Sequence, residues 1–364
     1  MKKLNLFFFL FLTFSTFSSA LAVIKNSDSS SLWKVAILFL DTPEDPQLQT
    51  SILENLKEVQ GIKKQFPSDK MKLKVLHAKY SVEKSFSESA LKIKKEIKEF
   101  FISPSTGSTK TLFIIYGHGK AYDGLGPFSI LELKEILVPT DILWLDSCFM
   151  SNLEVAYELR KYYRYLLASE DSEISSGIPY NSLLRLLKTQ SPEQAAFQLA
   201  EDFVLSYSKA KKGQQSHNVI ESAMTISVID TSTWSIFLKY FIPEWAQLKK
   251  LALKDAKKFK SSIQYATMDD PQFIDLGSVS KLWGLTDLSE LLDVQMVKQA
   301  RLNHEYDYVF LKSTESDNPV KFIGYTLRRH GLTKTYTGLS IANPLFGHSF
   351  NYLDLELSKK FPRF

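Results

Sequence analysis

The chain has 364 residues, of which 44% are hydrophobic and 13% are aromatic. That apolar content can bury a full core and excludes intrinsic disorder, collagen-like sequence and small disulfide-rich scaffolds. With 45 basic and 40 acidic residues, the formal net charge of +5 is too small to indicate a nucleic-acid partner, and none is expected.

The amino-terminal segment has the pattern of a secretory signal peptide. Lys2 and Lys3 precede an apolar run over residues 6–17, and small residues then lead to an A-x-A-like site at Ala20-Leu21-Ala22. A spanning helix needs about 20 apolar residues, and this run is shorter and broken by hydroxyl side chains. We therefore predict export into a periplasm or the medium, with residues 1–22 removed and no membrane span in the mature chain.

The rest of the chain divides into three expected parts. Residues 23–32 form a polar tether, residues 33–243 a first domain, and residues 244–364 a smaller carboxyl-terminal domain of mixed helices and strands. No internal repeat or low-complexity tract is found. A monomer is expected.

Apolar runs alternate with segments of helical spacing in the first expected domain. The runs have the composition of strands buried on both faces, and they lie at 33–40, 73–78, 112–116, 142–145 and 165–168. The helical segments lie at 48–59, 87–101, 129–137 and 152–162. This alternation predicts a mostly parallel sheet covered by helices on both sides.

Capping boxes mark the starts of three expected helices. In this pattern a serine side chain and a Glu or Gln three residues later satisfy each other's free backbone N–H groups. The pairs are Ser129 with Glu132, Ser151 with Glu154, and Ser191 with Gln194.

The expected second domain begins with a basic helical segment over residues 244–263. A charge run of this kind is more typical of a solvated helix face than of a surface that binds membranes or acidic partners. Strand-like pieces follow at 308–312, 321–327 and 339–342.

Cys148 is the only cysteine, so the chain has no internal disulfide. Exported proteins usually pair their thiols, and a single one needs an explanation. It is a buried small hydrophobic residue, a nucleophile, or a thiol for an intermolecular bridge.

The ends of two expected strands favour the nucleophile. One strand ends in Gly117-His118-Gly119 and the next in Asp146-Ser147-Cys148, and the carboxyl ends of parallel strands share one edge of the sheet. His118 could take the thiol proton and return it to a leaving amine, and the following helix would direct its positive end at Cys148. The amides of Gly119 and Cys148 could bind the oxyanion. Spacing alone leaves the alternative that Gly-His-Gly is only a turn.

These strand-end residues, together with the block from Asp146 to Leu159 and the later stretch Ala168-Ser169-Glu170, resemble the clostripain family of cysteine peptidases. The family belongs to a clan that includes caspases, legumains and gingipains. Similarity continues with gaps from about residue 33 to residue 344. The resemblance implies a caspase-like α/β/α sandwich with a mostly parallel central sheet over residues 33–243, and a smaller α+β domain after it.

The resemblance also implies a function. Cys148 and His118 would form the catalytic dyad of an endopeptidase that cleaves after Arg or Lys, and Asp146 would bind the basic side chain. A carboxylate in a partly desolvated pocket favours such a guest. The alternative for Asp146 is that it only orders the strand end.

The chain departs from the family pattern in one loop. The family often has a further acidic residue after the Ala-Ser-Glu block, whereas residues 174–177 supply only serines as polar side chains, with Asp171 and Glu173 just upstream. Two alternatives therefore stay open: the same chemistry with a non-basic specificity, and an exported binding or scaffold protein that keeps the fold without catalysis. Relatives often mature by self-cleavage near the link between His118 and Cys148. The basic residues of this link are Lys120 and Lys134, and Lys120 is the more exposed candidate, in what is expected to be a flexible loop.

No cofactor is expected, although some relatives use calcium and a calcium site stays possible. Asp269 and Asp270 form no recognisable calcium loop. The remaining histidines lack ligand spacing and are interpreted as surface or structural residues. They are His77, His217, His304, His330 and His348.

Overall fold

The computed structural model describes most of the chain after residue 31. The described residues are 32–42, 44–79, 86–104, 108–173, 175–189, 191–208, 224–266, 270–285, 287, 295–302, 306–312, 320–329, 332–333, 339–343, 355 and 357. The expected signal peptide and nearly all of the expected tether lie outside them. Residues 31–364 form one compact unit.

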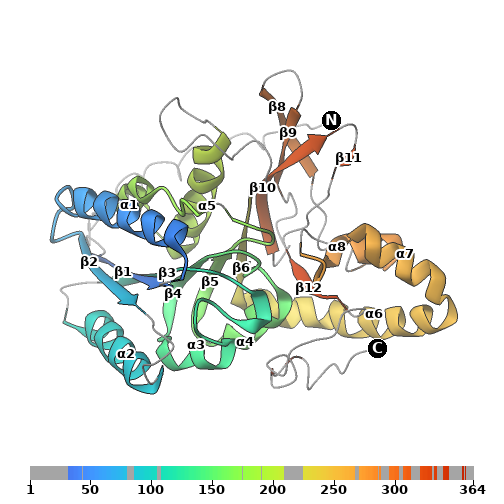
Figure 1. The fold of residues 1–364 in the computed structure, drawn as a ribbon, viewed down its shortest axis with the longest axis horizontal. Coiled ribbons are helices and arrows are strands. Elements are labelled where there is room, and N and C mark those ends of the chain that lie inside the picture. Colours follow the sequence, from blue (N-terminus) through green and yellow to red (C-terminus); the bar gives the residue numbers. More distant parts are fainter. Residues whose placement is uncertain are drawn as a thin grey trace, which may run out of the picture. The chain divides into compact units, whose positions relative to one another are not determined.

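The main sheet has its strands in the order β2-β1-β3-β4-β5-β6-β10-β9-β8 (Figure 1). The first five of these are mutually parallel: β2 Met71–Lys79, β1 Leu32–Asp41, β3 Thr109–Tyr116, β4 Thr140–Asp146 and β5 Tyr163–Ala168. The others are antiparallel: β6 Met224–Asp230, β10 Val320–Arg329, β9 Tyr306–Lys312 and β8 Gln295–Leu302. The short β11 (Leu332–Thr333) pairs with β10. The expected mostly parallel central sheet is confirmed over β1–β5.

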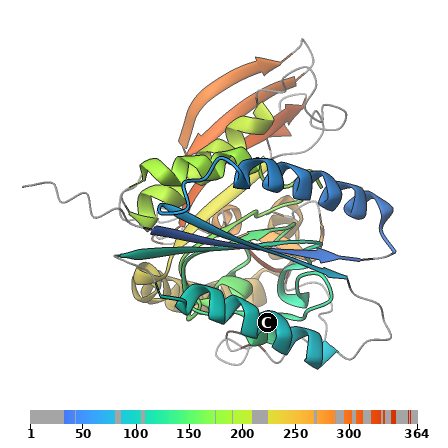
Figure 2. The same cartoon turned by 90° about the vertical axis from the view of Figure 1, so that its left-hand side faces the viewer.

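The continuous apolar runs arise because helices cover the sheet on both faces. In β1, Val35 and Phe39 face one core, and Ala36 and Leu38 face the other. The second core is built with α2 (Phe86–Ile102), α3 (Ile130–Ile136), α4 (Leu153–Leu159), α6 (Trp234–Lys254), α7 (Ala256–Ala266) and α8 (Leu276–Leu282). The first is built with α1 (Pro46–Lys63), the 3-10 helix η2 (Tyr180–Lys188) and α5 (Pro192–Ser208). Figure 2 shows α1 and α2 on opposite sides of the strands.

The domain boundary expected between residues 243 and 244 falls inside α6. Pro243 stands within this helix without ending it. Aromatic side chains on both sides of the proline bury one helix face and stack on each other: Phe237 on Phe241, and Phe241 on Trp245. This packing outweighs the loss of one helical hydrogen bond. In addition, β10 from the expected second domain pairs with β6 in the main sheet.

The three expected capping boxes differ in how far the structure bears them out. The box of Ser129 and Glu132 at the start of α3 is confirmed in both directions. At α4 the expected box is wrong, because Asn152 caps the helix and the Glu154 carboxylate instead accepts from the Ala342 amide at 3.2 Å. Before α5, the Ser191 hydroxyl accepts from the Gln194 amide at 3.1 Å.

The contact at Glu154 joins a small second sheet to the helix after Cys148. This sheet pairs β7 (Phe273–Asp275) with β12 (Ser340–Ala342). The Ser340 amide donates to the Ser151 carbonyl at 3.0 Å. Among the described residues, no helix combines the length and the apolar composition that crossing a bilayer requires.

Candidate active site

The register of β3 and β4 brings the two expected catalytic residues to one edge of the sheet. Tyr116 pairs with Asp146 at the strand ends, and His118 and Cys148 each lie two residues beyond that pair. The Ser147 hydroxyl donates to the Gly117 carbonyl at 2.6 Å and ties the two turns together. The sequence-based expectation of a shared strand edge is confirmed in this respect.

Gly119 lies directly against the backbone of Cys148. A β-carbon at residue 119 would overlap the Cys148 carbonyl oxygen and lie 2.9 Å from the Ser147 β-carbon and 3.0 Å from the Cys148 amide nitrogen. The glycine is therefore required by space at this point. The two amides proposed for oxyanion binding come from backbones in contact.

A closed turn holds Gly119 in place. The Lys120 amide donates to Gly124 at 2.9 Å and the Gly126 amide to His118 at 2.6 Å. These two hydrogen bonds lie on either side of the bridge between Gly119 and Leu125. Neither of the two bonds uses the N–H group of Gly119.

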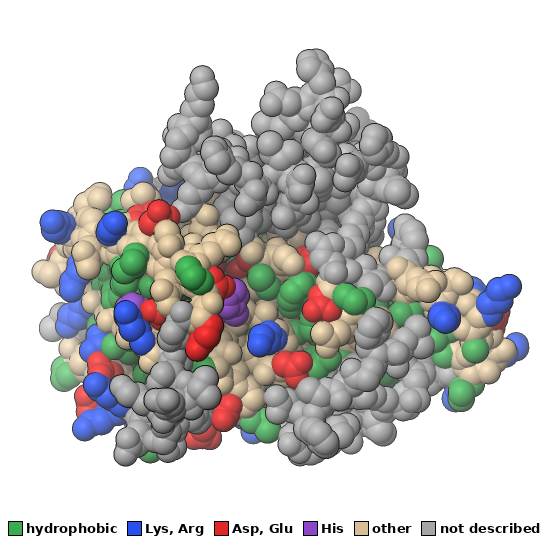
Figure 3. All heavy atoms as spheres, in the orientation of Figure 1, with side chains coloured by type: hydrophobic (Ala, Val, Ile, Leu, Met, Phe, Trp, Pro, Cys, Tyr) green, Lys and Arg blue, Asp and Glu red, His purple; other side chains and the backbone are tan. Residues whose placement is uncertain are grey.

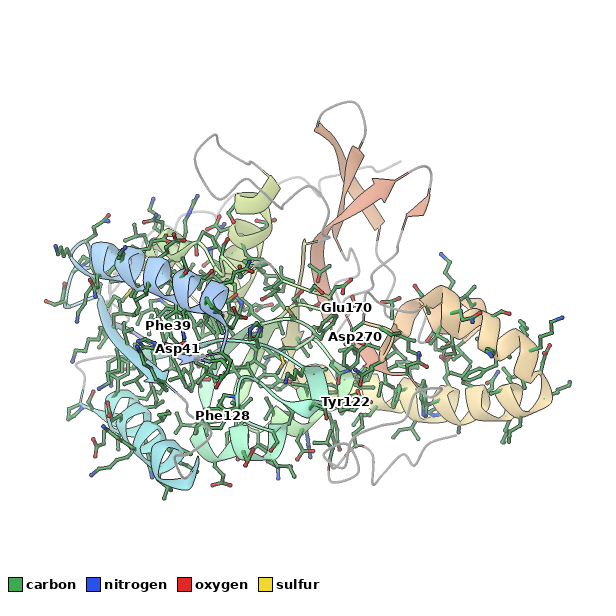
Figure 4. All side chains as sticks on the ribbon, viewed as in Figure 1. Phe39, Asp41, Tyr122, Phe128, Glu170 and Asp270 are labelled. Carbon is green, nitrogen blue, oxygen red and sulfur yellow. The ribbon has the colours of Figure 1, made fainter. Side chains whose placement is uncertain are left out.

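The loop that was expected to be flexible is thus a compact turn. It contains the 3-10 helix η1 (Ala121–Asp123), and its side chains Tyr122 and Phe128 are fully buried (Figure 4). Lys120 is exposed, but Ala121 is not. Cleavage after Lys120 would require this turn to open and stays a prediction.

Two residues other than glycine have a positive φ in the described part of the chain. They are Ala121, at 46°, and Phe149, at 60°. Phe149 directly follows Cys148, and Ala121 lies three residues after His118. Backbone strain of this kind persists only where the surroundings enforce it, and it gathers at functional sites.

The His118 side chain bonds to Asp45, a residue that sequence reasoning did not single out. The distance from His118 Nε2 to Asp45 Oδ2 is 2.6 Å, and the two side chains are 48% and 33% exposed. Asp45 also caps α1, because its Oδ1 accepts from the amides of Gln47 and Leu48. The Leu48 amide and then His118 hold the pKa of Asp45 below its usual range, so this carboxylate is ionised. Figure 3 shows histidine side chains next to acidic ones on this face.

The Cys148 thiol is half-buried and bonds to a loop. Its Sγ lies 3.2 Å from the Glu173 amide, which donates to it, and 3.7 Å from the Glu173 carbonyl. Burial raises the pKa of Cys148 to about 11, although the Glu173 amide acts in the opposite direction. In the described structure no hydrogen bond joins the thiol to His118.

The helix that was expected to direct its positive end at this thiol begins beyond it and does not offset its desolvation. α4 begins only at Leu153, and its first amides are capped by Asn152. Desolvation is the larger effect, because a helix terminus acts only within about one turn. The thiol is therefore neutral here at pH 7.

The loop over Cys148 is anchored at its start. The Asp171 carbonyl accepts from the Phe149 amide at 3.1 Å. The Thr225 hydroxyl in β6 accepts from the Glu170 amide at 3.1 Å and lies 2.8 Å from the Ser169 hydroxyl. These contacts fix the Ala-Ser-Glu block, in which Glu170 is fully buried (Figure 4).

Asp146 lies at the base of the same site and is only 2% exposed. Its Oδ2 accepts from the Ile178 amide at 3.2 Å. Burial raises the pKa of Asp146 to about 7, against the lowering effects of Ile178 and of a hydrogen bond with the Glu173 side chain. The Glu173 carboxyl, noted in the sequence without a role, thus meets the residue expected to bind substrate.

The other candidates form no site in the described residues. His77 bonds to Asp41 at 3.0 Å, as expected for a structural histidine. His217, His304, His330, His348 and Asp269 lie outside the described residues. Within the described part, no three His, Cys, Asp or Glu side chains gather as metal ligands.

A family model described as the clostripain family matches residues 94–318, more than half of the chain. No curated protein matches.

Solved structures of C11 proteases are among those similar in fold. One is a secreted C11 cysteine protease from Bacteroides thetaiotaomicron in complex with an irreversible peptide inhibitor, with a TM-score of 0.59, 16% identity, and coverage of 90% of this chain and 98% of that chain. Another is an inactive zymogen C11 protease from Parabacteroides distasonis, with a TM-score of 0.57, 16% identity, and coverage of 91% and 98%.

Proposed function

Because the chain belongs to the clostripain family of cysteine peptidases, we propose that it is an exported endopeptidase in which Cys148 and His118 form the catalytic dyad and Asp146 selects Arg or Lys. The observation that carries the proposal is the packing of Gly119 against Cys148 at the ends of adjacent parallel strands. It places an imidazole, a thiol and two amides in neighbouring turns. Export is proposed from residues 1–22, and one similar structure is of a secreted protease.

The proposed reaction follows from these positions. His118 takes the proton of the Cys148 thiol, since the raised pKa leaves little thiolate otherwise. The sulfur attacks the substrate carbonyl carbon, and the amides of Gly119 and Cys148 bind the resulting oxyanion. His118 then protonates the leaving amine, and water hydrolyses the thioester to release the second product and restore the thiol.

Substrate access requires a rearrangement at Cys148. The thiol bonds to the Glu173 backbone on one side, and His118 bonds to Asp45. A movement of the Glu173 segment and of the half-exposed imidazole would have to bring the two side chains together, and active-site hydrogen bonds are often loose before substrate binds.

Asp45 is proposed to position His118. We expect Asp45→Asn to lower kcat roughly tenfold with KM unchanged, because an amide still caps α1 but binds an imidazolium more weakly than a carboxylate does. Asp45→Ala should also destabilise the fold by about 1 kcal/mol through loss of the cap. Steady-state kinetics and thermal unfolding of both variants separate these effects, and an unchanged kcat in Asp45→Asn would remove Asp45 from the mechanism.

Asp146 is proposed to bind the basic side chain. Asp146→Asn should lower kcat/KM for an Arg peptide by roughly 10²-fold at pH 8, since removing one member of a desolvated charge pair costs several kcal/mol. Asparagine can still accept from the Ile178 amide, so the loop should stay in place. A peptide with a neutral residue directly before the cleaved bond serves as the control. The parent protein and Asp146→Asn should cleave it at similar rates.

The direct test of function measures the rate at which the reduced mature chain hydrolyses peptide substrates in which the cleaved bond follows Arg, Lys, Asn or Asp. The Cys148→Ala protein is the control. Cleavage after Arg and Lys supports the proposal, and cleavage after other residues alone keeps the chemistry but changes the specificity. A folded chain that cleaves none of them would favour a binding protein that retains the fold. The neutral thiol bound to Glu173 is the observation that motivates this second candidate.

A further inference from the structure

A phenylalanine from the carboxyl-terminal part of the chain packs against both turns of the candidate active site. We call these the His118 turn (residues 117–126) and the Cys148 turn (residues 147–152). Phe273 in β7 is only 2% exposed. Its ring centroid lies 5.6 Å from that of Tyr122 and 5.2 Å from that of Phe149, with interplanar angles of 72° and 32°. One ring therefore contacts an aromatic side chain from each turn.

The two partner rings lie close in sequence to the proposed dyad. Tyr122 is fully buried in η1, four residues after His118, and the half-buried Phe149 directly follows Cys148. The backbones of the same two turns also meet where Gly119 packs against Cys148. Phe273 thus adds a side-chain bridge to a backbone contact.

Each turn also contains one of the strained residues described above. Ala121, which has a positive φ, directly precedes Tyr122, and Phe149 has a positive φ itself. A residue held in this region persists there only when its surroundings enforce it. Aromatic pairs prefer particular relative orientations, so the packing of both rings on Phe273 is one source of that restraint.

Phe273 is itself held by the small second sheet. It pairs with Ala342 of β12, whose amide donates to the Glu154 carboxylate in α4. The Ser340 amide of β12 donates to the Ser151 carbonyl. The ring is therefore placed by strands that are attached to the segment directly after Cys148, and a side chain carried by such a supported element keeps a fixed position.

We infer that Phe273 is a positioning residue for the proposed dyad, and that its ring holds the His118 turn and the Cys148 turn at a fixed separation. The inference rests on the proposed function, because it concerns the geometry of the same site. Phe273 would act through Tyr122 and Phe149 rather than on the substrate. A misplacement of about 1 Å at the reacting groups can lower a rate about 10²-fold.

Phe273→Leu tests the bridge, because leucine keeps an apolar side chain at this place and removes the ring that meets Tyr122 and Phe149. We expect kcat for an Arg peptide to fall about tenfold or more, with KM changed less than about twofold. Steady-state kinetics gives both values, and thermal unfolding gives the loss of stability.

Phe259→Leu is the matched control variant. Phe259 in α7 is buried in the same core, and its ring centroid lies 5.8 Å from that of Trp283. The substitution removes an aromatic pair from the core without changing either ring partner of Phe273. It should lower the unfolding temperature by a similar amount and leave kcat within about twofold of the parent.

Phe149→Leu approaches the same bridge from the Cys148 turn. It removes one of the two ring contacts from a half-buried position. Because the two substitutions break one contact, the double variant with Phe273→Leu should lose less kcat than the product of the two single losses. If Phe273→Leu does not fold, the kcat of Phe149→Leu decides, and an unchanged value would overturn the inference.

Hydrogen exchange measured by mass spectrometry supplies a readout that does not depend on activity. Backbone amides in both turns should exchange faster in Phe273→Leu than in the parent, and at the parent's rate in Phe259→Leu. Faster exchange in only one turn or in neither, full kcat in a folded Phe273→Leu, or an equal loss of kcat in Phe259→Leu would overturn the positioning role.

The exchange data also separate this inference from the proposed function. If the parent protein hydrolyses no peptide, the peptidase proposal fails. Faster exchange of both turns in Phe273→Leu alone would then still support the bridge between them, and unchanged exchange would remove it as well.

Discussion

Cys148→Ala is expected to lower the rate of Arg-peptide hydrolysis by at least about 10⁴-fold, and His118→Ala by about 10³-fold or more, while both proteins stay folded. The first change removes the only nucleophile of the proposed mechanism. The second removes the acceptor for a proton that the thiol otherwise retains, since burial holds the pKa of Cys148 at about 11. Rates from purified proteins, with circular dichroism as a check on folding, measure both losses.

His77→Ala is the matched control for these variants. His77 bonds to Asp41 through Nε2, as His118 bonds to Asp45, and both histidines lie near strand ends. In the described structure the hydrogen-bond and ion-pair partner of His77 is Asp41 rather than Cys148 or its turn, so activity should change less than about twofold. Activity that survives in Cys148→Ala would contradict the mechanism outright.

Gly119→Ala is expected to lower both activity and stability. Its new methyl group would overlap the Cys148 carbonyl, and a backbone atom cannot move aside as a flexible side chain can. Overpacking costs about 1–3 kcal/mol. Moving the Cys148 amide away from the oxyanion position should lower kcat by about 10²-fold or more. Chemical unfolding and steady-state kinetics measure the two effects.

Gly61→Ala gives the comparison. Gly61 lies in α1, and no atom lies within 4 Å of its expected β-carbon. Alanine there should stabilise the chain by about 0.5–1 kcal/mol and leave kcat unchanged. If Gly119→Ala kept full activity, the two turns would not need their close contact, and the proposed oxyanion site would be wrong.

The central sheet could be predicted because its signal is local. Strands covered on both faces are continuous apolar runs, and each expected run lies within a strand from β1 to β5. The position of His118 and Cys148 at the same edge of the sheet followed from the same pattern, since parallel strands share their carboxyl ends.

Other features depend on contacts between distant residues. Asp45 is separated from His118 by 73 positions, and its place before Pro46 indicates only a helix cap. Glu173 is 25 positions from Cys148, and only folding brings it to Asp146. The cap at α4 differs from the expected box because the Glu154 side chain is used by the Ala342 amide, which the local sequence does not reveal.

The expected boundary between residues 243 and 244 meets a continuous helix for a related reason. A proline preceding a basic segment is a reasonable local sign of a new element. The stacked aromatic rings of α6 continue the helix through Pro243, and they are recognisable only as a buried face once the helix is packed. The pairing of β10 with β6 likewise joins strands about 90 to 100 residues apart in the sequence.

The most direct test of the account is covalent labelling with an electrophilic ketone peptide ending in Arg, followed by peptide mapping by mass spectrometry. The account predicts a single adduct on Cys148 that forms at least about 10²-fold faster than in His118→Ala. Equal rates in the two proteins, or a folded chain whose Cys148 stays unmodified while a small neutral thiol reagent reacts with it, would contradict the proposed dyad.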